Sequence, residues 1–390
     1  MSFFERIGNG NRKEKIYLTE RIAGGGAADI FKIKTFSDEV AKIYKSNQDL
    51  QLYEKKVRMM IDFNPNLPDF VDPLSKKIYP LAAWPRALLI KRGFKGFTMP
   101  KINLNESTTM QRLLQSSMRR HHGLNQALWY RLAVARNLCA LISTLNKMHY
   151  YIIDLKPLNL QVYKKNGNIV LLDCDGISMM NKSQGFAGTQ VTPDYTAPEN
   201  FGKKAANFDE IKCQRQERFA LAVIIFQLLN NGLHPFAFLV KNRKYAGGVL
   251  ENIKNRRYVY DRNKHKWGSP NPQSIHESFT DELRDLFDSA FMSIDRPSPH
   301  DWFVELDKFV ATKDKSRFKC KNNPNHFNFG KGCGECTKYH SNQIQLNKIN
   351  PASLQNTDTL IFLLIKNRTP SFLFTFVAVF IGILLLIGTN

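Results

Sequence analysis

Alternating apolar and polar residues open the chain and predict β-structure. The alternation runs from Lys15 to Ile22 and again from Glu39 to Tyr44, and a period of two is typical of strands. Between these runs three consecutive glycines, Gly24, Gly25 and Gly26, precede a further apolar stretch. Glycines in a row form a flexible loop whose backbone can approach phosphate groups closely. A plain β-turn is the alternative for this segment.

Three longer segments have the spacing of helices. The segment from Asp49 to Ile61 has apolar residues at Leu52, Val57, Met60 and Ile61, which predicts a helix that carries Glu54. From Leu128 to His149 an apolar position recurs every three or four residues, which predicts one long helix with a buried face. The run from Phe219 to Leu229 is almost wholly apolar and eleven residues long, too short to cross a bilayer, so it predicts a buried core helix.

Acidic, basic and amide side chains gather in the middle of the chain. Asp154, Lys156 and Asn159 lie within six residues, and Asp173 follows fourteen residues after Asn159. An Asn-Gly turn signal separates two short apolar runs between Asn159 and Asp173, which predicts a β-hairpin. Asn159 and Asp173 should then lie at the same end of the hairpin. Amide and carboxylate oxygens held together there suit Mg²⁺, with phosphate oxygens and water completing its ligands.

This arrangement resembles the catalytic loop of protein kinases, Asp-x-Lys-Pro-x-Asn, followed by the family's metal-binding aspartate. The resemblance implies that Asp154 accepts the proton of a substrate hydroxyl, that Lys156 steadies the transferred phosphoryl group, and that Asn159 and Asp173 hold Mg²⁺. A lysine two residues after the catalytic aspartate resembles the serine/threonine branch. The family's Asp-Phe-Gly triplet reads Asp-Cys-Asp here, which makes Asp175 a rival metal ligand. An ordinary turn is the alternative reading of the motif.

The resemblance extends more loosely to the N-terminal part of the chain. Gly24 to Gly26 take the place of the glycine-rich loop over the nucleotide phosphates, and Lys42 resembles the strand lysine that contacts the α- and β-phosphates. Glu54 is then the candidate carboxylate that positions Lys42, with a solvent-facing residue as the alternative. Met99 would lie behind the adenine, and Lys101 would stand in the hinge that binds it.

The segment from Thr192 to Glu199 resembles the end of the kinase activation segment. Thr192 corresponds to the hydroxyl that bonds the catalytic aspartate and lysine. Glu199 corresponds to the Ala-Pro-Glu carboxylate, whose expected partner is Arg296, because a buried carboxylate needs a cation and Arg binds it through two hydrogen bonds. Glu217 falls where the family has an acid that accepts hydrogen bonds from the backbone of the catalytic loop.

The composition limits the class of protein and its partners. The 390 residues include 56 Lys and Arg against 34 Asp and Glu, a formal net charge of +22 that favours nucleic acid, anionic membranes or acidic proteins. The basic residues are spread along the chain, which is more typical of a solvated surface than of one binding site. Six cysteines do not form a disulfide framework and indicate a reducing compartment. The polar stretch 1–15 is no signal peptide.

A possible metal module follows the kinase-like region. Cys320, His326, Cys333 and Cys336 lie within seventeen residues, and Cys₃His is a closed structural zinc set. A segment this short could hardly fold without its metal. His340 competes with His326 as the fourth ligand, and a redox or incidental cysteine pair is the alternative. A closed site leaves no position for a catalytic water, so docking or support of the lobe is the expected role.

The last fifty residues predict a linker and a membrane anchor. Residues 341–370 are mostly polar, and residues 371–388 contain a sixteen-residue run without charge. With its flanking residues the run approaches the ~20 residues of a transmembrane helix. Lys366 and Arg368 precede it and predict that the preceding part of the chain is cytoplasmic. A buried core helix is the alternative.

Taken together, the sequence predicts an α+β, two-lobed, kinase-like protein with a small zinc knuckle or ribbon and a C-terminal transmembrane helix. The expected activity is transfer of the γ-phosphoryl group of ATP to serine or threonine in a protein, with Mg²⁺ required and the protein substrate unknown. A catalytically inactive kinase-like scaffold is the alternative, and nucleic-acid binding is less favoured. The predicted boundaries are 15–310 for the kinase-like domain (N-lobe 15–99, hinge 100–102, C-lobe 103–310) and 317–340 for the zinc module.

Overall fold

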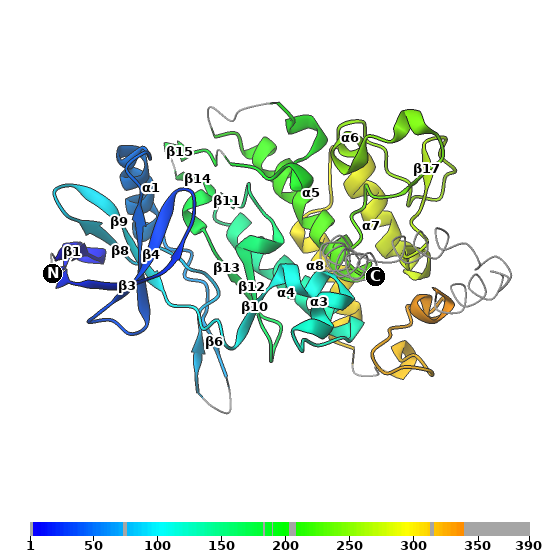
Figure 1. Cartoon of the computed structure of the whole chain (residues 1–390), viewed down its shortest axis with the longest axis horizontal. Coiled ribbons are helices and arrows are strands. Elements are labelled where there is room, and N and C mark those ends of the chain that lie inside the picture. Colours follow the sequence, from blue (N-terminus) through cyan, green and yellow to red (C-terminus); the bar gives the residue numbers. More distant parts are fainter. Residues whose placement is uncertain are drawn as a thin grey trace, which may run out of the picture. The chain divides into compact units, whose positions relative to one another are not determined.

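The computed structural model describes residues 3–72, 76–181, 184–188, 190–202, 208–312 and 316–338. Within these ranges the chain has an N-terminal β-rich region followed by a helical region (Figure 1). The residues up to Glu335 belong to one compact unit. The predicted α+β class is confirmed for this part of the chain.

The N-terminal region is a seven-stranded antiparallel sheet in the order β2-β1-β8-β9-β5-β4-β3. Its strands are β1 (Phe4–Ile7), β2 (Lys13–Ile16), β3 (Leu18–Gly24), β4 (Ala28–Ile33), β5 (Glu39–Tyr44), β8 (Ala87–Ile90) and β9 (Phe94–Pro100). The strand predicted over residues 15–22 is divided, because the chain stops pairing with β1 at Ile16 and pairs with β4 from Leu18. The strand predicted over Glu39–Tyr44 is confirmed as β5, between β4 and β9.

In the part of the chain that the structure describes, one helix packs on this sheet. α1 (Leu50–Asp62) begins at Asp49, whose side chain accepts a hydrogen bond from the backbone N–H of Leu52. Its apolar face packs on β8 and β9, where Val57 shares a core cluster with Phe97. This packing decides which other side chains of α1 point toward the interior of the protein.

The helical region is organised around two buried helices. α4 (Leu128–Asn146) packs along α8 (Pro299–Val310), and α5 (Glu210–Leu229) is buried over most of its length. Both predicted buried helices are therefore confirmed. The other helices are α2 (Met110–Leu114), α3 (Ser116–His121), α6 (Gly248–Lys254) and α7 (Asp281–Met292). Short strands complete the region: β6 (Phe70–Val71), β7 (Ile78–Tyr79), β10 (Ser107–Thr109), β11 (Tyr150–Tyr151), β12 (Leu160–Tyr163), β13 (Ile169–Leu171), β14 (Ser178–Asn181), β15 (Gln184–Phe186), β16 (Leu239–Val240) and β17 (Gly268–Ser269).

The predicted hairpin is confirmed as β12 and β13, with Leu160 opposite Leu171. Its turn contains Gly167 at φ +71°, where the space for a side chain is also limited by Val134 of α4. At the other end of the hairpin the backbone N–H of Leu172 donates to the carbonyl of Asn159 at 2.9 Å. Asn159 and Asp173 consequently lie at the same end, as expected.

No helix within the described ranges is both long and apolar enough to cross a bilayer. The predicted linker over residues 341–370 and the predicted anchor over residues 371–388 lie outside the described residues. His340, the competing metal ligand, lies outside them as well.

Candidate active site

Two side chains in the loop that follows β11, Asp154 and Lys156, form a compact hydrogen-bonded group with Thr192. Lys156 Nζ donates to Asp154 Oδ2 at 2.5 Å and to Thr192 Oγ1 at 2.9 Å. Thr192 Oγ1 in turn donates to Asp154 Oδ1 at 2.7 Å. The hydrogen bonds predicted for Thr192 are therefore confirmed, and they join the loop to a segment almost forty residues further along the chain.

A buried acid on α5 holds the backbone of this loop. Glu217 is fully buried and accepts a hydrogen bond from the backbone N–H of Ile152 at 2.6 Å and from Asn146 Nδ2 at 2.7 Å. Burial raises the pKa of Glu217 to about 8. The neighbouring Gln216, which the sequence analysis did not identify, donates to the carbonyls of Ile153 and Tyr195. The predicted contact of Glu217 with the loop backbone is confirmed.

Asn159 and Asp173 are positioned by the backbone around them. Asn159 Nδ2 donates to the carbonyl of Asp154 at 3.0 Å, which orients its amide toward the same loop. Asp173 adopts a left-handed backbone conformation with φ +55°, uncommon for a residue other than glycine. Its side chain remains 47% exposed and can accept further ligands.

Lys42 reaches this group from β5 and contacts two aspartates. Its Nζ lies 2.6 Å from Asp173 Oδ1 and 2.5 Å from Asp175 Oδ1, and the Tyr44 hydroxyl donates to Asp175 Oδ2 at 2.6 Å. Burial favours the neutral lysine, but the negative charges of Asp175 and Asp173 outweigh it and hold the pKa of Lys42 above its usual value. Burial likewise acts to raise the pKa of Asp175, but Lys42 and Tyr44 keep that pKa below its usual value.

The expected pairing of Lys42 with Glu54 is wrong in this structure. Glu54 faces outward on α1 and pairs with Arg58 at 3.1 Å. Lys56, two residues further, lies about 200° around the helix and therefore on the buried face. The carboxylate that clamps Lys42 comes instead from Asp175, whose side chain is only 5% exposed. Its place two residues after Asp173 is the signal that could have identified it.

The inner face of α1 brings an additional cation toward the same place. Lys56 is 6% exposed, and burial lowers its pKa to about 8 although Asp175 and Asp173 act in the opposite direction. Lys56 was not among the site residues predicted from the sequence. Only the orientation of α1 on the sheet distinguishes it from the exposed Lys55.

These groups line one cavity of about 600 Å³ between the sheet, α1 and the hairpin end. The polar side chains that line it include Lys42, Lys56, Asp154, Asn159, Asp173 and Asp175. Charged groups far apart in the sequence thus converge on one cavity. Such an arrangement is typical of a binding or catalytic site.

The other residues predicted to bind the nucleotide are not among the residues that line this cavity. Gly24 is the last residue of β3, and Gly25 and Gly26 lie in the exposed connection to β4. The Gly25 carbonyl accepts a hydrogen bond from Lys45 Nζ at 2.6 Å. Met99 stands in β9 opposite Val40 of β5. Lys101 follows β9, and its backbone N–H donates to the carbonyl of Asp38. Their contacts with a nucleotide remain predictions.

The predicted pair of Glu199 and Arg296 is confirmed. Arg296 Nη1 and Nη2 donate to the two carboxylate oxygens of Glu199 at 2.5 and 2.9 Å, a two-pronged contact between residues 97 positions apart. The Arg296 side chain is fully buried. The pair fixes the segment after Thr192 to the helical region.

Cys320, His326, Cys333 and Cys336 come together as predicted, with their ligand atoms all within 4.8 Å of one another. A tetrahedral zinc ion with bonds of about 2.3 Å to sulfur and about 2.0 Å to nitrogen sets sulfur and nitrogen roughly 3.5 Å apart. Cys333 Sγ and His326 Nδ1 are 3.6 Å apart. The Cys₃His cluster is therefore consistent with a structural zinc site.

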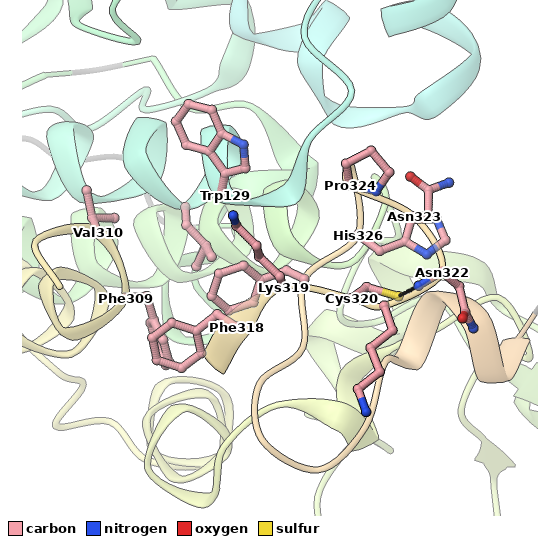
Figure 2. Close-up of a pocket in the computed structure, with 13 residues that line it drawn as sticks. Trp129, Phe309, Val310, Phe318, Lys319, Cys320, Asn322, Asn323, Pro324 and His326 are labelled. Carbon is pink, nitrogen blue, oxygen red and sulfur yellow. Dashed lines mark hydrogen bonds between the residues drawn. The ribbon is translucent and has the colours of Figure 1, made fainter. Parts of the chain in front are cut away.

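The segment that carries this cluster is attached to the helical region. The backbone N–H of Leu128, at the start of α4, donates to the carbonyl of Asn325, and Lys331 pairs with Asp281 of α7 at 2.6 Å. An apolar cavity of about 480 Å³ lies beside the cluster; Figure 2 shows Trp129 of α4 on one side and Cys320 and His326 on the other. These contacts agree with a role in docking or support.

Two curated proteins have sequences similar to this chain, and both are protein kinases by name. No family model matches the chain. Protein kinase YegI of Escherichia coli strain K12 is 27% identical over 301 residues, which cover 74% of this chain and 44% of the relative. Protein kinase YegI of Escherichia coli O157:H7 is 27% identical over 294 residues, with 73% and 43% covered. The chain is a distant homologue of a protein kinase. The chain spans less than half the length of these curated relatives. The predicted resemblance to kinases is confirmed at the level of the kinase family only.

Proposed function

We propose that this protein is an ATP-dependent serine/threonine protein kinase of two-lobed architecture, with the sheet region and the helical region as its lobes. The observation that carries the proposal is the convergence of Lys42 from the sheet with Asp154, Asn159 and Asp173 from the helical region on one cavity. These side chains come from segments more than 100 residues apart, and the same groups perform phosphoryl transfer in the family.

Each side chain has a role that its position supports. Lys42, held by two carboxylates, keeps its positive charge and binds oxygens of the nucleotide phosphates. Asp154 orients the acceptor hydroxyl and accepts its proton as the oxygen bonds to the γ-phosphorus and the bond to ADP breaks. Lys156 binds oxygens of the phosphoryl group in transfer, and its contact with Thr192 supports the serine/threonine assignment.

Asn159 and Asp173 are the residues that fit a magnesium ion. Their amide and carboxylate oxygens are the hard ligands that Mg²⁺ prefers, and the half-exposed Asp173 can accept more partners. Both oxygens of Asp175 already accept hydrogen bonds, from Lys42 and Tyr44, which supports Asp173 as the principal ligand. When bound, the ion neutralises charge on the phosphates of ATP.

Two further properties belong to the proposal. The Cys₃His cluster would hold one structural zinc ion, because four protein ligands close the site to a catalytic water. A cytoplasmic position beside a membrane rests only on the uncharged run within residues 371–388 and the basic residues before it.

The proposal can be tested with the full chain, ATP labelled at the γ-phosphate and mixed protein acceptors. We expect Mg²⁺-dependent labelling of serine or threonine that falls at least about a hundredfold in Asp154→Asn, since general base catalysis contributes roughly 10²–10⁴. Asp62→Asn, an exposed carboxylate at the end of α1, is the matched control and should keep the parent rate. Binding of ATP without labelling of any acceptor would support the inactive scaffold instead.

A further inference from the structure

Lys56 is a buried cation that the proposed mechanism does not use. It lies on the inner face of α1, is 6% exposed, and lines the same cavity as Lys42 and Asp173. In the part of the chain that the structure describes, Lys56 makes neither a hydrogen bond nor an ion pair, and its charge acts on Asp175 and Asp173 only from a distance. Lys42, in contrast, contacts both aspartates directly.

A buried ammonium group without a direct partner destabilises a protein. The nearby aspartates do not require it, because Lys42 already binds both and Tyr44 binds Asp175. Moreover, the exposed neighbour Lys55 shows that a lysine at this level of α1 can be placed in solvent. The position of Lys56 therefore points to an anionic ligand that enters the cavity.

The balance of charge identifies the ligand. Two lysines, Lys42 and Lys56, and four aspartates line the cavity. Asp154 is paired with Lys156, and Asp49 accepts a hydrogen bond from the backbone at the start of α1. The two lysines therefore lie beside the two remaining carboxylates, Asp173 and Asp175. A divalent cation held at Asp173 would neutralise those carboxylates, and two ammonium groups would then face the remaining space. Such a space is complementary to a chain of phosphates, which carries several negative charges and many acceptor oxygens.

We propose that Lys56 binds an oxygen of the nucleotide's phosphate chain as a second cation beside Lys42. Helix α1 then contributes a basic side chain that binds the phosphates, and not a carboxylate that pairs with Lys42. The inference rests on the proposed kinase function and deepens it. Lys56 is then a residue that touches substrate, whereas Asp175 acts through Lys42 and is a positioning residue.

The test compares the full-length parent with Lys56→Met, Lys56→Arg and the control Lys55→Met, which removes the adjacent exposed lysine. Calorimetry with Mg²⁺ measures binding of ATP, ADP and adenosine to each protein, and circular dichroism verifies the fold. We expect Lys56→Met to bind ATP about tenfold more weakly, the size of one lost hydrogen bond to a charged group. Adenosine, which has no phosphate, should bind it unchanged. Lys56→Arg should retain most of the affinity for ATP, and Lys55→Met all of it.

The outcomes separate this inference from the proposed function. If the parent binds ATP with Mg²⁺ and Lys56→Met binds it equally well, the role of Lys56 is refuted while the kinase proposal stands. A loss of ATP and adenosine binding in equal proportion would mean that Lys56 only supports the fold, which also overturns the inference. If Lys56→Met does not fold, Lys56→Arg is compared with Lys55→Met instead. An ATP affinity tenfold weaker in Lys56→Arg, at equal stability of the two variants, would contradict the proposed role of Lys56. A parent that binds no ATP refutes both proposals.

Discussion

Replacing each of the two aspartates beside Lys42 by asparagine should have opposite consequences. Asp175 is 5% exposed and bonds Lys42 and Tyr44, whereas Asp173 is 47% exposed and bonds only Lys42 among the described side chains. Asparagine has nearly the same size as aspartate, so each substitution removes a charge with little change in packing. The two variants therefore separate a carboxylate that stabilises the fold from one that is available to a metal ion.

The magnitudes follow from burial. Breaking a buried ion pair typically costs about 3–5 kcal/mol. We expect Asp175→Asn to lower the free energy of unfolding by about 3 kcal/mol, because Asp173 remains beside Lys42. A half-exposed pair contributes only about 0–1 kcal/mol, so Asp173→Asn should leave stability almost unchanged. Conversely, Mg²⁺-dependent binding of ATP should be lost in Asp173→Asn and should persist in the folded fraction of Asp175→Asn.

Urea unfolding of the full chain at pH 7 measures the first effect, and calorimetric titration of ATP with and without Mg²⁺ measures the second. Asp62→Asn serves as the control for loss of an exposed carboxylate. A larger loss of stability in Asp173→Asn than in Asp175→Asn would refute a structural role for Asp175. Loss of the Mg²⁺ requirement in Asp175→Asn alone would show that the metal ligand had been misassigned.

Three further predictions concern other parts of the molecule. Burial lowers the pKa of Lys56 from 10.5 to about 8, so the unfolded chain binds the ammonium proton more tightly than the folded chain does. The free energy of unfolding of the parent should therefore increase by up to about 3 kcal/mol as the pH rises from 8 to 10.5. Lys56→Met should therefore be more stable than the unliganded parent by about 3 kcal/mol at pH 7 in urea unfolding, and a difference that does not shrink by pH 10.5 would contradict this. Arg296→Met should lower stability by about 3 kcal/mol, because it removes two short hydrogen bonds and leaves the Glu199 carboxylate with only the longer contact to Arg256 at 3.5 Å. The double variant with Glu199→Gln should be less affected than the single one, and equal losses would argue against the pair. Elemental analysis of the parent should find about one zinc ion per chain. Cys336→Ser should contain little zinc, whereas Cys213→Ser, which changes a cysteine of α5 outside the cluster, should contain as much as the parent. Removal of the metal by a chelator should lower the melting temperature of the parent.

Several features of the site could be predicted because they depend on residues close together in the chain. Asp154, Lys156 and Asn159 lie in one loop, and a hairpin with a strong turn signal brings Asp173 back to Asn159. The Cys₃His cluster is local in the same sense. The long-range pair of Glu199 and Arg296 was predicted from the resemblance to a family, since nothing in the intervening sequence specifies that contact.

The sequence by itself thus determined which chemical groups are present and which of them are neighbours through a loop or a hairpin. Only the tertiary structure decided which face of α1 turns inward, because a change of one position rotates a side chain by about 100° around the helix axis and packing on β8 and β9 selects the orientation. That choice turns Glu54 toward Arg58 and Lys56 toward the cavity, and it leaves Asp175 to bind Lys42. Helical periodicity specifies the relative angles of these residues, but the direction of the helix as a whole depends on contacts with strands more than twenty residues away.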